Sequence, residues 1–131
     1  MKNIIMLLIA FNTMLIFSCQ KNESKTIDKE KLNLTISKPT EAQQFNNGDT
    51  VFIKASAQYI APLHGYSIKI SDGSLQKTYF EIEQHLHETA FNIDTFWVNQ
   101  FEQNVDLKLT LTVEVDHDGN EVKKTINFSS K

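Results

Sequence analysis

The chain has 131 residues, a formal net charge of -3 and 13 basic side chains, all of them lysine. Without arginine or a basic run, it lacks the electrostatic footprint of a nucleic-acid-binding protein. Its single cysteine excludes an internal disulfide. After the N-terminal apolar stretch, no segment of the sequence has the length of a membrane-spanning helix.

Residues 1–18 have the pattern of a secretory signal peptide. Lys2 is followed by a short apolar stretch, residues 4–17. The stretch ends in the run Leu15-Ile-Phe-Ser-Cys19, which resembles the lipobox of bacterial lipoproteins. This resemblance implies cleavage before Cys19, lipidation of that residue (palmitate among the acyl chains) and anchoring to the outer membrane. The alternative is an ordinary signal peptide that happens to end near a cysteine.

Residues 19–31 are predicted to form a flexible linker behind the lipidated cysteine. The segment is polar and charged, and such a composition buries too little apolar surface to fold alone. Its start, Gln20-Lys-Asn-Glu23, is similar to the surface-export signal of bacteroidete lipoproteins, although Asn22 stands where that signal has an acidic residue. Both the cell surface and the periplasmic face of the outer membrane therefore stay open as locations.

From residue 32 onward the apolar residues alternate with polar ones, as in half-buried strands. The clearest case is Leu107–Asp116, with apolar residues at every second position. Turn signals containing Asp-Gly or Asn-Gly separate the alternating runs. We expect residues 32–131 to form an all-β domain, an antiparallel immunoglobulin-like β-sandwich of about seven strands. The expected strands are residues 32–37, 51–58, 64–71, 78–83, 88–96, 107–116 and 121–129.

The histidines are predicted to gather at one end of this sandwich. In an up-and-down strand order, His64, His85, His87 and His117 all fall in or beside connections at the same end. The alternation also gives all four the parity of the core-facing residues. We therefore expect the imidazoles to point inward and to meet across the mouth of the sandwich.

Converging neutral imidazoles form a ligand set for zinc or copper. Asp116 and Asp118 are weaker candidates for a carboxylate ligand or for orienting the histidines. The alternative is that the histidines are purely structural rim residues, hydrogen-bonded to water or backbone.

Several short motifs resemble a group of small uncharacterised bacteroidete lipoproteins. They are Pro62-Leu-His-Gly-Tyr-Ser-Ile68, His85-Leu-His87, Phe96-Trp-Val-Asn99 and Asp116-His-Asp-Gly-Asn120. The resemblance implies a membrane-anchored domain and brings no established activity. Members of the group often end in further histidines, whereas this chain ends in Phe128-Ser-Ser-Lys131.

The sequence carries no nucleophile elbow, no zinc-protease helix motif and no cysteine besides the one at the anchor. We therefore expect a binding module and no enzyme, with a zinc or copper ion as the possible ligand. The alternative function is an accessory or adhesion module that binds a protein or glycan, for example through Phe96, Trp97 and Phe101. A competing interpretation places Trp97 and Phe101 as a lid on the core.

Overall fold

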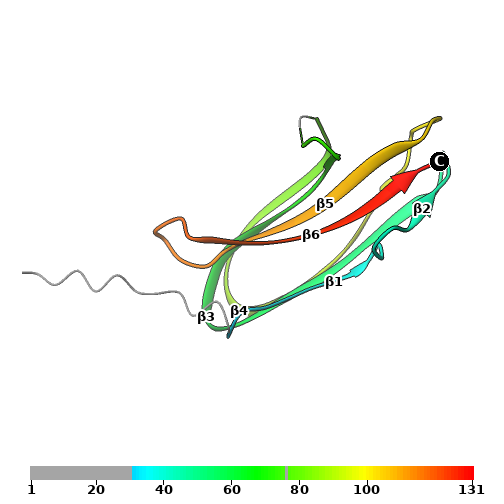
Figure 1. Cartoon of the computed structure of the whole chain (residues 1–131). Coiled ribbons are helices and arrows are strands. Elements are labelled where there is room, and N and C mark those ends of the chain that lie inside the picture. The colour runs from blue at the N-terminus through cyan, green and yellow to red at the C-terminus, as the bar shows by residue number, and fades with distance from the viewer. Residues whose placement is uncertain (1–30, 76) are drawn as a thin grey trace, which may run out of the picture.

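The computed structural model describes residues 31–75 and 77–131, which fold into one curled β-sheet (Figure 1). Cys19 and the predicted signal peptide lie outside the described residues. Within those ranges, no helix has the length and apolar character needed to cross a membrane. The strands are β1 (Asn33–Lys38), β2 (Gln44–Phe45), β3 (Thr50–Asp72), β4 (Thr78–Val98), β5 (Val105–Glu114) and β6 (Glu121–Ser130).

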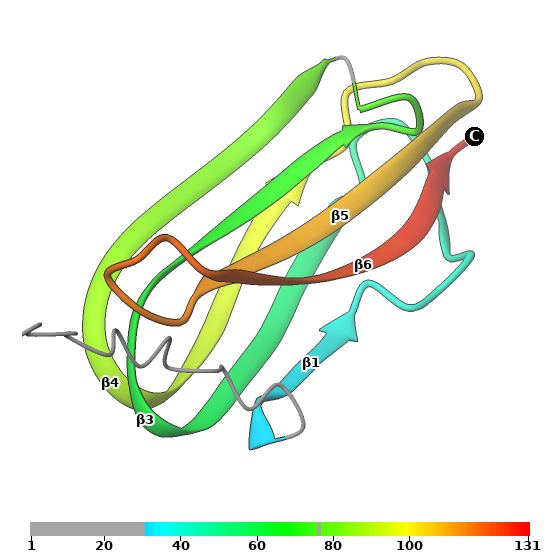
Figure 2. The same cartoon turned by 60° about the vertical axis from the view of Figure 1, so that its left-hand side comes forward.

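The sheet becomes a two-layer sandwich because the long β3–β4 hairpin bends in its middle (Figure 2). The first half of β3 pairs with β1 and with the second half of β4. Its second half pairs with the first half of β4 and with β5, which continues through β6 to β2. One layer is therefore β1–β3–β4 and the other is β4–β3–β5–β6–β2. This is the immunoglobulin-like arrangement that the sequence predicts.

Two details of the expected strand list are wrong. Residues 51–58 and 64–71 belong to one continuous strand, β3, and residues 78–83 and 88–96 belong to β4. The hairpin passes from one layer to the other through shifts in its ladder, so no loop interrupts either strand. The two-residue strand β2 was not expected, because it is defined only by its parallel pairing with the end of β6.

The core lies between the layers and follows the predicted alternation. On β5 the inward residues Leu107, Leu109, Leu111 and Val113 are at most 2% exposed. Burial of such side chains stabilises a domain by about 1.5–3 kcal/mol each. The remaining core residues come from both layers and include Val51, Ile53, Leu63, Ile68, Ile70, Phe91, Ile93 and Phe128.

Candidate functional site: a histidine cluster at the bend

A β-bulge at the hairpin bend brings His64 close to His87. Leu63 pairs with Glu88 and Gly65 pairs with His85. Between these two pairs β3 contributes a single residue, His64, whereas β4 contributes two. An extra residue on one strand bends the ladder and re-aims the neighbouring side chains. The bulge therefore holds histidines of β3 and β4 opposite each other.

The turn between β5 and β6 adds the fourth histidine, His117. Asp116 holds this turn closed, because its carboxylate accepts hydrogen bonds from the backbone N–H groups of Asp118 and Asn120 and from the Asn120 amide. These bonds lower the pKa of Asp116, with the Asn120 side chain as the first cause. Gly119, at φ 77°, provides the left-handed residue that such turns favour. The turn and the hairpin bend lie at the same end of the molecule (Figure 2).

The four imidazoles form one continuous group of touching rings, which we call the histidine cluster. The ring centroids of His64 and His117 are 3.7 Å apart, and those of His64 and His87 are 5.0 Å apart. His85 joins through His87, with ring centroids 4.7 Å apart and an Nε2–Nε2 distance of 3.0 Å. The predicted convergence of the histidines is therefore present in the fold.

The expectation that all four rings face the core is wrong. His64 is partly buried, but His85, His87 and His117 are exposed. In their place Leu86 packs against the core. The reason is the bulge, since a ladder that gains one residue reverses the inward and outward sides beyond that point. The cluster consequently lies on the surface of the bend and not across the mouth of the sandwich.

His64 is the most constrained member of the cluster. Its Nδ1 atom is buried and has no hydrogen-bond partner. Burial lowers the pKa of His64, and so do the neighbouring imidazoles of His117, His87 and His85, while Glu114 acts in the opposite direction. These effects favour neutral imidazole, which is the form that ligates metals.

In their present rotamers the histidines do not surround a common point. Among residues 31–75 and 77–131, no group of three His, Cys, Asp or Glu side chains is arranged to hold a metal ion. The Nε2 atoms of His85 and His87 are 3.0 Å apart and form a hydrogen bond. Two imidazole nitrogens on a tetrahedral zinc ion, each about 2.0–2.1 Å from the metal, lie about 3.3 Å apart.

Two residues of the site were not identified from the sequence. Gly65 leaves room for the bend, because a Cβ atom there would lie 2.9 Å from the Gln84 carbonyl oxygen. An isolated glycine inside an alternating strand is a signal of such a close backbone approach. Glu114 pairs with Gly65 in the ladder and interacts electrostatically with His64. Both residues line a hollow of about 190 Å³ on the outer face beside His85.

Of the predicted carboxylates, Asp116 serves the turn, as described above. Asp118 is exposed in the same turn, beside His117.

The aromatic residues at the other end of the domain have two different roles. Trp97 and Phe101 pack against the core, with ring centroids 6.1 Å apart, as the lid interpretation predicts. Phe96 instead projects outward and is 59% exposed.

Several solved structures resemble this chain in fold, and two of them are a fibronectin(III)-like module and a CARDB domain. No family model and no curated protein sequence matches it. The fibronectin(III)-like modules of Clostridium thermocellum CbhA are 14% identical, with a TM-score of 0.47 over 76% of this chain and 96% of theirs. A CARDB domain of Pyrococcus furiosus, solved in complex with di-metal ions, is 9% identical, with a TM-score of 0.45 over 74% of this chain and 91% of its own. At these TM-scores neither structure indicates what the present chain binds.

Proposed function

We propose that this domain is a non-enzymatic binding module that takes up a zinc or copper ion through His64, His85, His87 and His117. The observation that carries the proposal is the contact of four imidazole rings supplied by β3, β4 and the β5–β6 turn. Imidazole nitrogen is a preferred ligand of both metals, and three or four such ligands complete a tetrahedral or tetragonal site.

The electrostatics of the cluster support a metal over purely structural histidines. A buried nitrogen without a hydrogen-bond partner, such as Nδ1 of His64, costs free energy that a bound ligand would offset. A positive charge on His64 would lie beside the neighbouring imidazoles and in a buried place, and both effects lower its pKa and favour neutral imidazole at His64. Neutral rings keep a lone pair free for a cation.

Binding requires the exposed rings to turn toward a common point. His85, His87 and His117 have one exposed side, so changing their rotamers displaces no core residue. The hydrogen bond between His85 and His87 would break, and the proton on its donor nitrogen would move to Nδ1 of that ring or leave to solvent. The bulge and the Asp116 turn fix the backbone from which the rings turn.

The test is a calorimetric titration of the full-length chain, in mild detergent, with Zn²⁺ and separately with Cu²⁺ at pH 7.5. We expect binding close to one ion per chain, and a His64→Ala, His87→Ala, His117→Ala variant should lose it. An Asp118→Ala variant serves as the control for an exposed carboxylate beside the cluster. Absence of binding, or equal binding by the triple variant, would contradict the proposal.

We also propose that the domain is anchored to the outer membrane through a lipid on Cys19, facing the periplasm or the cell surface. This part rests on the sequence pattern of residues 1–31. Strand β1 begins at Asn33, opposite Gln58 of β3, at the bent end of the hairpin. A linker entering there would attach beside the histidine cluster.

A further inference from the structure

The end of the domain opposite the histidine cluster carries an unpaired strand edge. Strand β1 covers β3 only from Gln58 to Lys54, because the chain leaves this layer after Lys38 and joins the other layer as β2. In the described strands, Thr50–Ile53 pair with β4 alone. Along a strand, the backbone N–H and C=O groups of successive residues point alternately to one side and the other. About two of the four residues Thr50–Ile53 therefore point these groups away from β4, to the side where no strand pairs with them.

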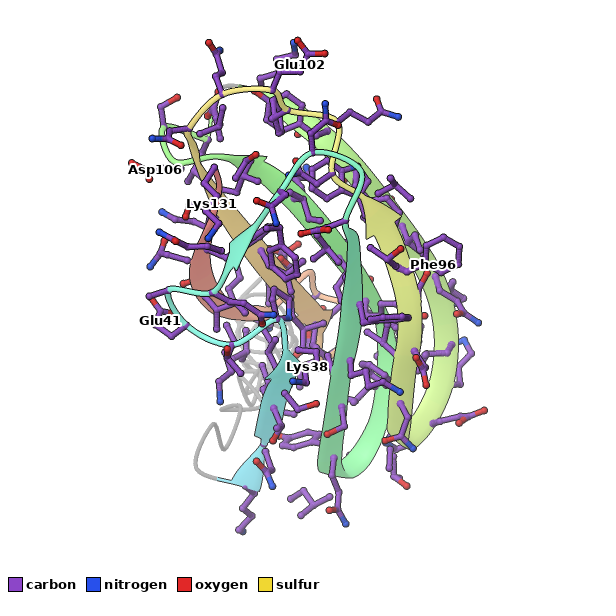
Figure 3. The ribbon with its side chains drawn as sticks, turned by 90° about the vertical axis from the view of Figure 1, so that its right-hand side faces the viewer. Lys38, Glu41, Phe96, Glu102, Asp106 and Lys131 are labelled. Atoms are coloured by element: carbon purple, nitrogen blue, oxygen red, sulfur yellow. The ribbon has the colours of Figure 1, made fainter. Side chains whose placement is uncertain are left out.

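A groove with apolar and basic walls runs along this edge. It has a volume of about 170 Å³ and is lined by Lys38, Gln43, Phe45, Thr50, Phe52 and Lys54. We call it the edge groove. Figure 3 shows Lys38 at the end of β1, on one side of β3, and Phe96 projecting outward from β4 on the other side.

Two exposed aromatic side chains lie on the outer face beside the groove. Phe52 and Phe96 are direct partners across β3 and β4, and they are 55% and 59% exposed. Val98 lies at the end of the same strand and is also exposed. Exposed aromatic side chains grouped in this way are typical of surfaces that contact another molecule.

We propose that the edge groove binds an extended, acidic segment of a partner protein by strand addition. The segment would continue the line of β1 and form an antiparallel ladder with Thr50–Ile53. One apolar side chain would pack on Phe52, and a carboxylate would face Lys38. This inference concerns a different surface from the proposed metal site and does not depend on it.

The charge of the groove favours an acidic segment. Lys54 already forms an ion pair with Asp94, 2.7 Å away, which leaves Lys38 for the partner. A glycan would stack on the phenylalanines but would not form a β-ladder with the free backbone groups.

The experiment titrates the isotope-labelled full-length chain, in mild detergent, with a blocked peptide of about six residues in which a valine and a glutamate stand two positions apart, so that both side chains lie on the face of Phe52 and Lys38. We expect shifts of the Thr50–Ile53 amide signals and slower hydrogen exchange of the amides on the free side. The same peptide with N-methylated backbone amides keeps its side chains but cannot form the ladder. It should bind at least about tenfold more weakly, and so should a valine–lysine peptide.

Variants distinguish specific binding in the edge groove from nonspecific binding to exposed apolar side chains elsewhere. Phe52→Ser should weaken binding of the glutamate peptide about tenfold. Ile60→Ser is the matched control, since Ile60 is 64% exposed and lies at the bent end. Lys38→Glu should reverse the preference toward the lysine peptide. His85→Ala should leave peptide binding unchanged, which keeps this test distinct from the metal titration.

Three results would overturn the inference. The first is that millimolar glutamate peptide leaves the Thr50–Ile53 amides unshifted. The second is that the N-methylated peptide binds as well as its parent. The third is that a β-linked oligosaccharide shifts Phe52 and Phe96 whereas the peptide does not, which would assign the surface to a glycan.

Discussion

His64 combines a buried nitrogen with close contacts to other imidazoles. Its ring lies 3.7 Å from that of His117 and 5.0 Å from that of His87, measured between centroids. Burial and these neighbours lower the pKa of His64 below its ordinary value of 6.5. In the unfolded chain the same side chain is solvated and titrates near its ordinary value. The two states therefore bind different numbers of protons in mildly acidic solution.

This difference predicts that the metal-free domain becomes less stable in acid. Between pH 6.5 and the lower pKa of His64 in the folded state, the unfolded chain binds more protons than the folded chain. The contribution of neutral His64 to the free energy of unfolding is therefore complete above pH 6.5. It is lost as the pH falls through this window. Thermal melts in chelator at a series of pH values should show the decline. His64→Gln should flatten it.

The groups facing His64 provide the control for this prediction. The imidazoles of His117 and His87 lower the pKa of His64 more than His85 does, and Glu114 raises it. His85→Gln should therefore keep most of the pH dependence. A His64→Gln variant with the same decline as the original chain would show that the effect originates elsewhere.

The bend of the β3–β4 hairpin determines where the site lies. Gly65 passes so close to the backbone of β4 that a Cβ atom would meet the Gln84 carbonyl oxygen at 2.9 Å. The contact is with backbone, so no side-chain rotation relieves it. The bulge that opposes His64 to His87 begins at this residue.

Gly65→Ala should therefore strain the bend and move the histidines. Overpacking of this kind costs about 1–3 kcal/mol of unfolding free energy. Denaturant unfolding should report that loss, and the imidazole NMR signals of His64 and His87 should shift. The matched control is Gly73→Ala, where the added atom would make only ordinary contacts at 3.5 Å or more. Equal stability of the two variants would contradict this account of the bend.

The bend also shows how far the sequence can predict this domain. Alternation located the strand segments of β3 to β6, because half-buried strands repeat every second residue. The common end of the four histidines followed from the strand order. The direction of their side chains did not, because a one-residue bulge depends on the partner strand and leaves no periodic signal. Strand β2 also leaves no periodic signal, because it has only two residues and is defined by its pairing with β6.

The two ends of the sandwich differ in the side chains that they expose. The bent end carries the histidine cluster and the start of β1, where Asn33 pairs with Gln58. The opposite end carries the edge groove and the exposed pair Phe52–Phe96. A fully extended linker over residues 20–31 would span at most about 40 Å. With a lipid on Cys19, the start of β1 and the histidine cluster beside it would stay within about that distance of the membrane.

The anchor predicts a change of cell fraction on mutation of Cys19. Cys19→Ser removes the only thiol in the chain, and with it the attachment point of the proposed lipid. In a bacterial host the original chain should incorporate labelled palmitate and sediment with the outer membrane. The variant should incorporate no labelled palmitate. A band of the mature size should be missing from its outer-membrane fraction. Equal labelling of both chains would contradict the lipoprotein prediction.

If the touching imidazoles of the histidine cluster bind a metal ion, a bound copper ion will have imidazole nitrogens among its ligands. Electron paramagnetic resonance of the full-length chain loaded with one equivalent of Cu²⁺ tests it most directly, because nitrogen hyperfine coupling reports imidazole ligands. We predict coupling from three or four nitrogens, reduced by a ligand in each of the His64→Ala and His117→Ala variants. A spectrum of aqueous or oxygen-coordinated copper, or one unchanged by these substitutions, would contradict metal binding by the cluster.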